Sequence, residues 1–229
     1  MKNCNAPNSR TTSRILLTAC ATALAAAFMV ALPQPAYADD LTPPPVPGNI
    51  KVEAGNVAFL VGHGVGTQNY VCLPSGTGVA YVLFTPEATL FSDDEKQLTT
   101  HFFSPDPLEN NTNPAVVAVG PIRVTWQHSR DTSTVWGFVK TGDSSSDLAF
   151  VAPNAIPWLK VTVAKTENGP TGGDTLTKTT FIQRLNTSGG VAPSTGCSSP
   201  TDVGHLAFVP YTADYFFFKA ADGQANDGN

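Results

Sequence analysis

The segment that decides the fold is residues 206–218, LAFVPYTADYFFF, near the end of the chain. In an extended strand, successive side chains point to opposite faces of the sheet. One face would therefore carry Tyr211, Ala213, Tyr215 and Phe217, and the other would carry Thr212, Asp214, Phe216 and Phe218. Because both faces are largely apolar, we expect this strand to be central in a sheet or to form part of a barrel wall.

Shorter runs of the same character occur along the whole chain. They are rich in Val, Thr, Phe and Tyr and are bounded by Gly, Pro, Asn and Asp, which is typical of strands separated by turns. We expect strands at Ile50–Glu53, Val57–Leu60, Asn69–Cys72, Val79–Phe84, Leu98–Phe103, Val116–Val119, Ile122–Trp126, Thr134–Val139, Trp158–Ala164, Thr175–Arg184 and Leu206–Phe218. The predicted fold is therefore all-β and mostly antiparallel, a sandwich or a barrel in a single domain.

Local patterns refine this prediction. Within the Trp158 run, Leu159, Val161 and Val163 are expected on the core face. The glycine-rich segment His63–Gly66 predicts a hairpin turn and not a phosphate-binding loop, because no Lys-Ser/Thr pair follows it. Residues 93–98 could form at most a turn of helix, and loops are expected at 109–114, 142–147, 168–174 and 187–200.

The composition excludes several classes of protein. Only 14% of the 229 residues are charged, and the chain holds 19 Gly and 19 Pro. A coiled coil or charged helical bundle would be rich in Ala, Glu, Lys, Leu and Arg instead. The formal net charge of −5 argues against a protein that wraps DNA.

The first 38 residues have the pattern of a secretory signal peptide. Basic residues at positions 2, 10 and 14 precede the apolar run Ile15–Leu32, and Ala36-Tyr37-Ala38 follows it. We expect cleavage after Ala38 and a secreted or periplasmic location. A retained membrane anchor is the alternative, because an apolar run of this length could just span a bilayer.

Cleavage would leave an acidic mature chain. It would comprise a Pro-rich extended arm at 39–48, a β domain at 49–220 and a disordered tail at 221–229. Removing three basic residues makes the net charge −8. That charge argues against nucleic acid and anionic membranes as partners, and no stable membrane span would remain.

Two cysteines, Cys72 and Cys197, would remain in the mature chain. In an oxidising compartment two cysteines usually pair, so we expect one disulfide that closes a long loop. The alternative is a catalytic thiol, which no His/Cys spacing in the sequence supports.

Several sequence motifs in the C-terminal third resemble those of one secreted bacterial and fungal family. They are residues 155–159 (AIPWL), 180–193 (TFIQRLNTSGGVAP), the Gly196-Cys197 pair and 209–218 (VPYTADYFFF). Upstream, residues 68–72 (QNYVC) and 101–103 (HFF) also resemble it. The family is known only as a domain of unknown function, number thirty-four fifty-five. The resemblance implies export, a β-rich domain and a pairing of its Tyr-x-Cys and Gly-Cys cysteines, but no activity.

Few residues in the sequence indicate chemistry. The four histidines, His63, His101, His128 and His205, show no metal-ligand spacing, and no metal or cofactor is expected. His101 lies among Phe102, Phe103 and two threonines, where a buried imidazole would need a partner.

Arg184 and Asp214 form the best candidate polar pair. Both lie in strands that are otherwise apolar or rich in Thr. They could clamp a ligand in a barrel mouth, or they could form a buried ion pair that ties two strands together. The candidate ligand-binding residues are therefore His101, Arg184, Asp214, Tyr211 and Tyr215.

Two functions remain open at this stage. The preferred one is an exported, non-enzymatic β domain that binds a small molecule, a glycan or an envelope partner. The alternative is an exported hydrolase-type enzyme or a metal-binding protein that uses His101, Arg184 and Asp214. Convergence of these three residues on one pocket would favour the enzyme.

Overall fold

The fold was analysed in a computed structural model that describes residues 41–105 and 121–221. The expected signal peptide, the expected strand Val116–Val119, the loop at 109–114 and residues 222–229 lie outside this part of the chain. All described residues belong to one compact unit. Among them, no helix is long and apolar enough to cross a membrane.

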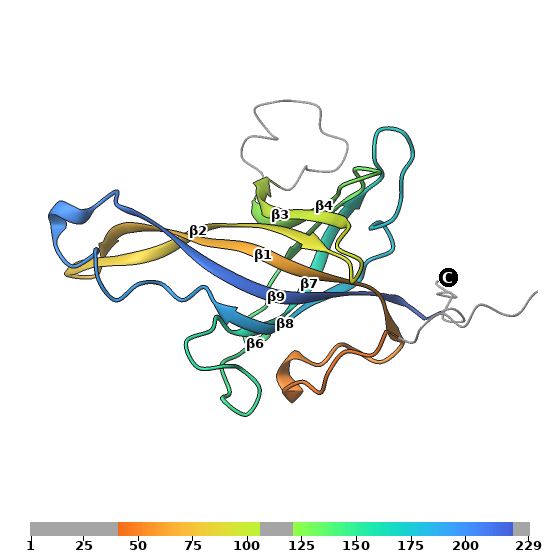
Figure 1. Cartoon of the computed structure of the whole chain (residues 1–229), viewed down its shortest axis with the longest axis horizontal. Coiled ribbons are helices and arrows are strands. Elements are labelled where there is room, and N and C mark those ends of the chain that lie inside the picture. Colours follow the sequence, from red (N-terminus) through yellow and green to blue (C-terminus); the bar gives the residue numbers. More distant parts are fainter. Residues whose placement is uncertain (1–40, 106–120, 222–229) are drawn as a thin grey trace, which may run out of the picture. The chain divides into compact units, whose positions relative to one another are not determined.

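The described chain is all-β, with antiparallel strand pairings throughout. The strands are β1 (Asn56–Ser75), β2 (Gly78–Phe91), β3 (Gln97–Pro105), β4 (Ile122–His128), β5 (Thr134–Phe138), β6 (Ser144–Ser145), β7 (Trp158–Glu167), β8 (Phe181–Gly189) and β9 (Leu206–Ala220). Their order is β5-β4-β3-β2-β1-β9-β8-β7-β6, and β5 also pairs with β7 (Figure 1). This last pairing closes a barrel of eight strands, with the short β6 as an addition outside it. Of the two predicted architectures, the barrel is the one observed.

The structure corrects the prediction for His63–Gly66, which is not a turn. The runs Val57–Leu60 and Asn69–Cys72 belong to one long strand, β1, and His63–Gly66 lies in its middle. The glycines there make room for other strands. A Cβ atom on Gly66 would lie 2.0 Å from the carbonyl oxygen of Glu87, and one on Gly64 would lie 2.8 Å from the Tyr215 ring. The glycines therefore mark close approach between strands, not a reversal of the chain.

Two further predictions about strands are wrong. Residues 50–53 form no strand, because Gly48–Ile50 is a 3₁₀ helix that buries Ile50. The strand expected from Thr175 begins only at Phe181, because the Thr175 backbone N–H donates to the Asp131 carboxylate and not to a neighbouring strand. At 93–98 there is no helical turn. Ser92–Lys96 instead forms the reversal between β2 and β3, with Glu95 in a left-handed conformation at φ 60°.

The barrel interior is filled by large side chains. The inner cluster comprises Ala88, Leu90, Trp126, Val135, Ile156, Val161, Leu176, Ile182, Tyr211, Ala213, Tyr215 and Phe217. The face predicted for Tyr211, Ala213, Tyr215 and Phe217 is confirmed, as is the core face of β7, where Leu159 and Val163 pack against this cluster.

A second apolar cluster lies on the outer side of the barrel wall. It contains Ile50, Val151, Trp158, Leu185, Phe216 and Phe218, and Leu41 and Val46 of the Pro-rich segment pack against it. Lys160 is buried beside it, with its ammonium 3.0 Å from a Glu53 carboxylate oxygen. The second apolar face of β9 is therefore covered by the chain that precedes the barrel and by the segment around Val151 between β6 and β7.

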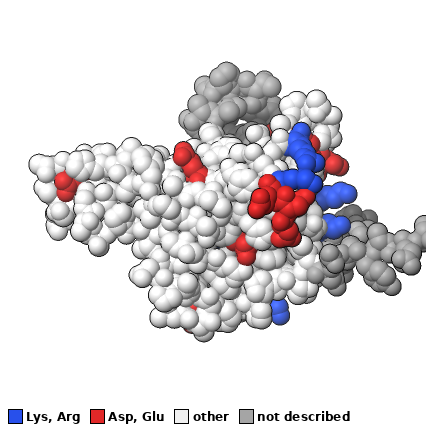
Figure 2. Space-filling model, in the orientation of Figure 1, with Lys and Arg blue, Asp and Glu red and all other residues white. Residues whose placement is uncertain are grey.

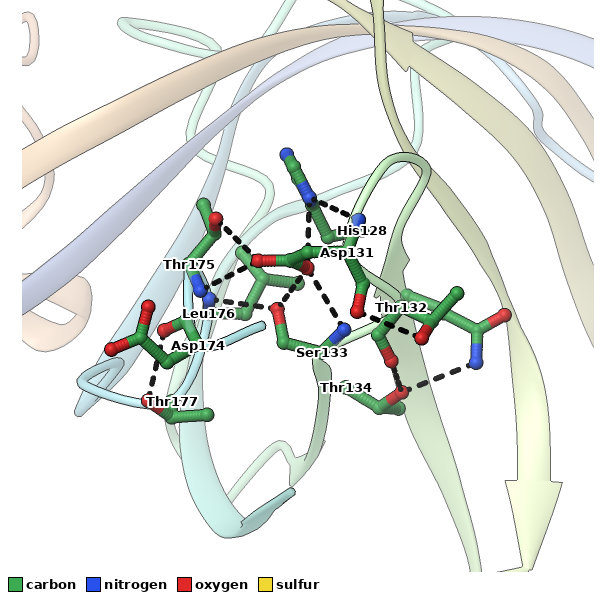
Figure 3. Close-up of polar contacts among 10 residues, drawn as sticks. His128, Asp131, Thr132, Ser133, Thr134, Asp174, Thr175, Leu176 and Thr177 are labelled. Carbon is green, nitrogen blue, oxygen red and sulfur yellow. Dashed lines mark hydrogen bonds and ion pairs between the residues drawn. The ribbon is translucent and has the colours of Figure 1, made fainter. Parts of the chain in front are cut away.

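At one end of the barrel, a hydrogen-bond network around Asp131 connects the turn between β4 and β5 to the loop before β8 (Figure 3). Asp131 lies in the turn between β4 and β5, and its carboxylate accepts hydrogen bonds from the backbone N–H and hydroxyl groups of Ser133 and Thr175. His128 Nδ1 lies 2.9 Å from the same carboxylate. The loop before β8 is thereby tied to the β4–β5 turn, and its Leu176 is fully buried in the inner cluster.

Beyond the barrel, β1, β2 and β9 continue as a three-stranded extension. Pairing of β2 with β3 begins only at Ala88, and pairing of β9 with β8 ends at Tyr211. The predicted disulfide is present in this extension and links Cys72 of β1 to Cys197, with Cα atoms 5.5 Å apart. Residues 66–86 contain no Lys, Arg, Asp or Glu, and in the view of Figure 2 this end of the molecule is almost free of charged side chains.

Candidate ligand-binding site

A pocket of about 250 Å³ lies at the barrel end away from Asp131. Side chains of β1, β2, β3, β4, β7 and β8 line it, together with the segments that follow β5 and precede β7. The lining residues are Gln68, Tyr70, Leu83, Pro86, His101, Phe103, Val124, Val139, Ile156, Pro157, Leu159 and Arg184. Most of this lining is apolar, and four of its members bring polar groups that could fix a ligand: Gln68, Tyr70, His101 and Arg184.

His101 is held in the inner part of this pocket. Its ring stacks on Trp126 with ring centroids 4.3 Å apart and an interplanar angle of 10°, and it is only 3% exposed. Nδ1 lies 2.9 Å from the carbonyl oxygen of Thr125 and must therefore carry a proton to donate. Burial lowers the pKa of His101 to about 3, with a smaller lowering from the charge of Arg184. The imidazole is thus neutral at pH 7, with Nε2 left as an acceptor.

Arg184 supplies the positive charge of the pocket. It lies opposite Tyr215 in the β8–β9 register, so it points to the barrel side of the sheet. One guanidinium nitrogen donates to the Pro157 carbonyl oxygen at 2.9 Å, and the side chain also interacts with the Tyr215 hydroxyl. The buried Nε forms no hydrogen bond of normal geometry among the described residues. Within the described chain, Arg184 also forms no ion pair with a carboxylate.

Tyr211 and Tyr215 lie next to these groups. Their hydroxyl oxygens are 2.9 Å apart, and both side chains are buried. Burial raises the pKa of both phenols, so both are protonated at neutral pH. They are hydrogen-bonding groups of the barrel interior and do not carry charge.

Asp214 does not join this site. It lies on the outer face of β9, where its carboxylate oxygens are 2.7 Å from His63 Nδ1 and 2.7 Å from the Asn186 side-chain nitrogen. The predicted pairing of Arg184 with Asp214 is therefore not formed, because the two residues point to opposite faces of the sheet. His101, Arg184, Tyr211 and Tyr215 come together, and Asp214 does not.

His63 bridges two carboxylates on the outer face. Its Nδ1 faces Asp214, and its Nε2 lies 2.9 Å from Asp93 in the β2–β3 turn. Both ring nitrogens can donate only when the imidazole is doubly protonated. The hydrogen bond to Asp214 raises the pKa of His63 above its ordinary value of 6.5, partly opposed by burial, and the hydrogen bond to Asp93 adds to the rise.

This arrangement predicts a pH-dependent stability. A raised pKa in the folded state stabilises the fold below pH 6.5, and that contribution is lost as the pH rises through the folded-state pKa. We expect the free energy of unfolding of the wild type to fall between pH 5.5 and 9, and His63→Gln to show a flatter profile. Urea unfolding across this range measures both. Equal slopes for the two proteins would contradict the assignment.

Sequence reasoning missed two pocket residues, Gln68 and Tyr70. Gln68 is 2% exposed, and its side-chain nitrogen forms no hydrogen bond of normal geometry within the described chain, although the side chain interacts with the Tyr211 hydroxyl. The Tyr70 hydroxyl donates to the Gly190 carbonyl oxygen at 2.6 Å. The family-like motif at 68–72 drew attention to this segment, but it implied no function for either residue. No group of three or more His, Cys, Asp or Glu residues that could hold a metal occurs in the described ranges.

Fold and pocket together define the class: a closed, disulfide-linked antiparallel β-barrel with a mostly apolar mouth and an arginine that pairs with no carboxylate of the described residues. A family model described as a protein of unknown function (DUF3455) matches residues 53–219, and the chain belongs to that family. The search of curated proteins and the search of solved structures each found no match.

Proposed function

We propose that this protein is an exported, non-enzymatic barrel that binds a small molecule in the pocket at its mouth. The observation that carries the proposal is Arg184, whose buried Nε forms no hydrogen bond within the described residues and lies in a mostly apolar cavity. A buried polar group without a partner costs about 1–3 kcal/mol, and more when it is charged, unless a ligand or water supplies the missing acceptor.

Two features support export. The first 38 residues have the order of a secretory signal, with a basic start, an apolar middle and a small-x-small end. The disulfide between Cys72 and Cys197 is of a kind that persists in secreted and periplasmic proteins and is rare in the cytosol.

The same geometry favours a small molecule over a glycan. A sugar would stack on exposed aromatic rings, whereas Trp126, Trp136 and Trp158 are all buried. The exposed rings of Phe84 and Phe208 lie in the extension and do not line this pocket. The hydrolase alternative relied on Asp214 acting with His101 or Arg184. Asp214 lies on the outer face, and His101 Nδ1 is occupied by the Thr125 carbonyl, so no carboxylate orients that imidazole.

Native mass spectrometry of the protein purified from its own compartment tests the proposal. We expect a retained small molecule that is released on denaturation. Val139, which is 38% exposed and lines the pocket, allows the cavity to be filled from its rim. Val139→Trp should abolish the bound species while the thermal midpoint stays close to that of the wild type. If the native mass of the wild-type protein equals that of the polypeptide alone, with no bound molecule, the result would count against the proposal.

A further inference from the structure

The polar groups of the pocket are mainly donors. Arg184 Nε and the Gln68 side-chain nitrogen are buried and form no hydrogen bond of normal geometry within the described residues. Arg184 interacts with the Tyr215 hydroxyl and Gln68 with the Tyr211 hydroxyl, and both side chains keep N–H groups that can donate to a ligand. Gln68 is 2% exposed and lines the cavity together with Arg184. The two donor side chains therefore belong to one site. Two donors of this kind, one of them charged, fit the two oxygens of a carboxylate.

The pocket has one positively charged lining side chain, so a ligand with a single negative charge matches it best. Arg184 is the one cationic side chain among the lining residues. His101 adds no second charge, because its Nδ1 proton is donated to the Thr125 carbonyl and the ring is buried. A dianion such as a phosphate ester would leave one charge uncompensated in an apolar cavity, which is costly. A neutral ligand would leave the guanidinium without a counter-charge.

The rest of the cavity selects an apolar body. Leu83, Pro86, Phe103, Val124, Ile156 and Leu159 supply its walls. An apolar cavity of about 150 Å³ holds a benzene molecule. The volume here, about 250 Å³, therefore accommodates a ring or short chain of that size together with a carboxylate.

We propose that the pocket binds a small monocarboxylate, with the carboxylate on Arg184 and Gln68 and the apolar body against the barrel-mouth walls. This inference rests on the proposed function, since it names the class of ligand for the same pocket.

Titration calorimetry with sodium benzoate and benzamide at pH 7 tests the charge requirement directly. The two probes have the same shape and differ in charge, so the comparison needs no variant. We expect benzoate to bind the wild-type protein at least tenfold more tightly than benzamide. Such a ratio would mean that the carboxylate is recognised and not only the ring.

Variants assign the recognition to residues. Arg184→Gln should weaken benzoate binding at least tenfold and remove the preference over benzamide, and Gln68→Leu should weaken it several-fold. Arg130→Gln is the matched control, because Arg130 is exposed at the β4–β5 turn at the other end of the barrel. It should leave the affinity for benzoate unchanged. Thermal melting confirms that each variant is folded.

The outcomes separate this inference from the proposed function. Equal affinities for benzoate and benzamide, both lost in Val139→Trp, would overturn the carboxylate assignment and leave small-molecule binding in place. A retained ligand without a carboxylic acid group would likewise overturn the carboxylate assignment and leave small-molecule binding in place. Failure of both probes to bind would overturn the inference. If the protein also lacked any retained molecule, the proposed function would fall with it.

Discussion

Replacing both Cys72 and Cys197 by Ala is expected to lower the free energy of unfolding by about 4 kcal/mol. The disulfide joins residues 125 positions apart, so its loss greatly increases the conformational freedom of the unfolded chain. It also anchors the extension formed by β1, β2 and β9, which is not paired to β3 or β8 in this region. Several of its apolar residues, including Phe84 and Phe208, are more than 40% exposed and add little stabilisation by burial.

Urea unfolding of the wild type and the double variant measures the loss. Hydrogen exchange locates it, because the Cys72 backbone N–H donates to the His205 carbonyl and the Gly204 N–H donates to the Cys72 carbonyl. Exchange should accelerate at residues 70–74 and 203–207, whereas the amides around Trp126 should keep their relative protection. A loss below about 1 kcal/mol would show that the extension is held by its strand pairing alone.

Asp131→Ala is expected to have the next largest effect, a loss of about 3 kcal/mol in the free energy of unfolding. The carboxylate accepts two backbone and two hydroxyl hydrogen bonds from Ser133 and Thr175, and the substitution leaves those donors without an acceptor. Gly169 and Gly173 pack so closely on Asp131 that a Cβ on either would clash with it. The surrounding loop therefore has little freedom to find replacement acceptors.

The same carboxylate makes the fold sensitive to acid. Desolvation raises the pKa of Asp131, but the hydrogen bonds from Thr175 and Ser133 outweigh it and hold the pKa well below its ordinary value of 3.8. Its contribution is thus complete above that value and is lost as the pH falls through the folded-state pKa. Urea unfolding at pH 7 and at pH 3 should show a smaller difference between the variant and the wild type at the lower pH.

Asp174→Asn is the control for this prediction. Asp174 is an exposed residue of the same loop, and in Figure 3 no dashed line reaches its carboxylate. Its backbone carbonyl, which the substitution keeps, accepts from Thr177. We expect a change within about 0.5 kcal/mol, as for ordinary surface substitutions. A comparable loss in both variants would assign the effect to the loop's charge and not to the Asp131 network.

The fold was largely predictable because its signals are local. Alternation along 206–218 correctly placed Tyr211 and Tyr215 on one side of a strand and Asp214 on the other. The signal failed at His63–Gly66, where glycines that make room for Tyr215 and Ala88 look like turn residues. Those contacts come from strands far away in sequence, and nothing local distinguishes the two uses of glycine.

The site was only partly predictable, for a related reason. Arg184 and Asp214 were each recognised as unusual, but whether they meet depends on the register between β8 and β9. That register shifts between Leu185 and Ser188, and it places Arg184 opposite Tyr215. Likewise, Gln68 becomes a pocket residue only because β1 runs through the region that looked like a turn. A single sequence contains no local signal for such long-range alignment.

The position of β1 between β2 and β9 governs when the chain can fold. Asn56, at the start of β1, pairs with Ala220, so the first strand of the barrel obtains one of its neighbours only after nearly the whole domain has been synthesised. Pairings this distant are slow to form, because a long loop must close before they give any stabilisation. Sequential pairings such as β1–β2 can form earlier, but the barrel cannot close before β9 has emerged from the ribosome. Under the proposed export, a chain whose barrel closes only with its last strand would cross the membrane before closure.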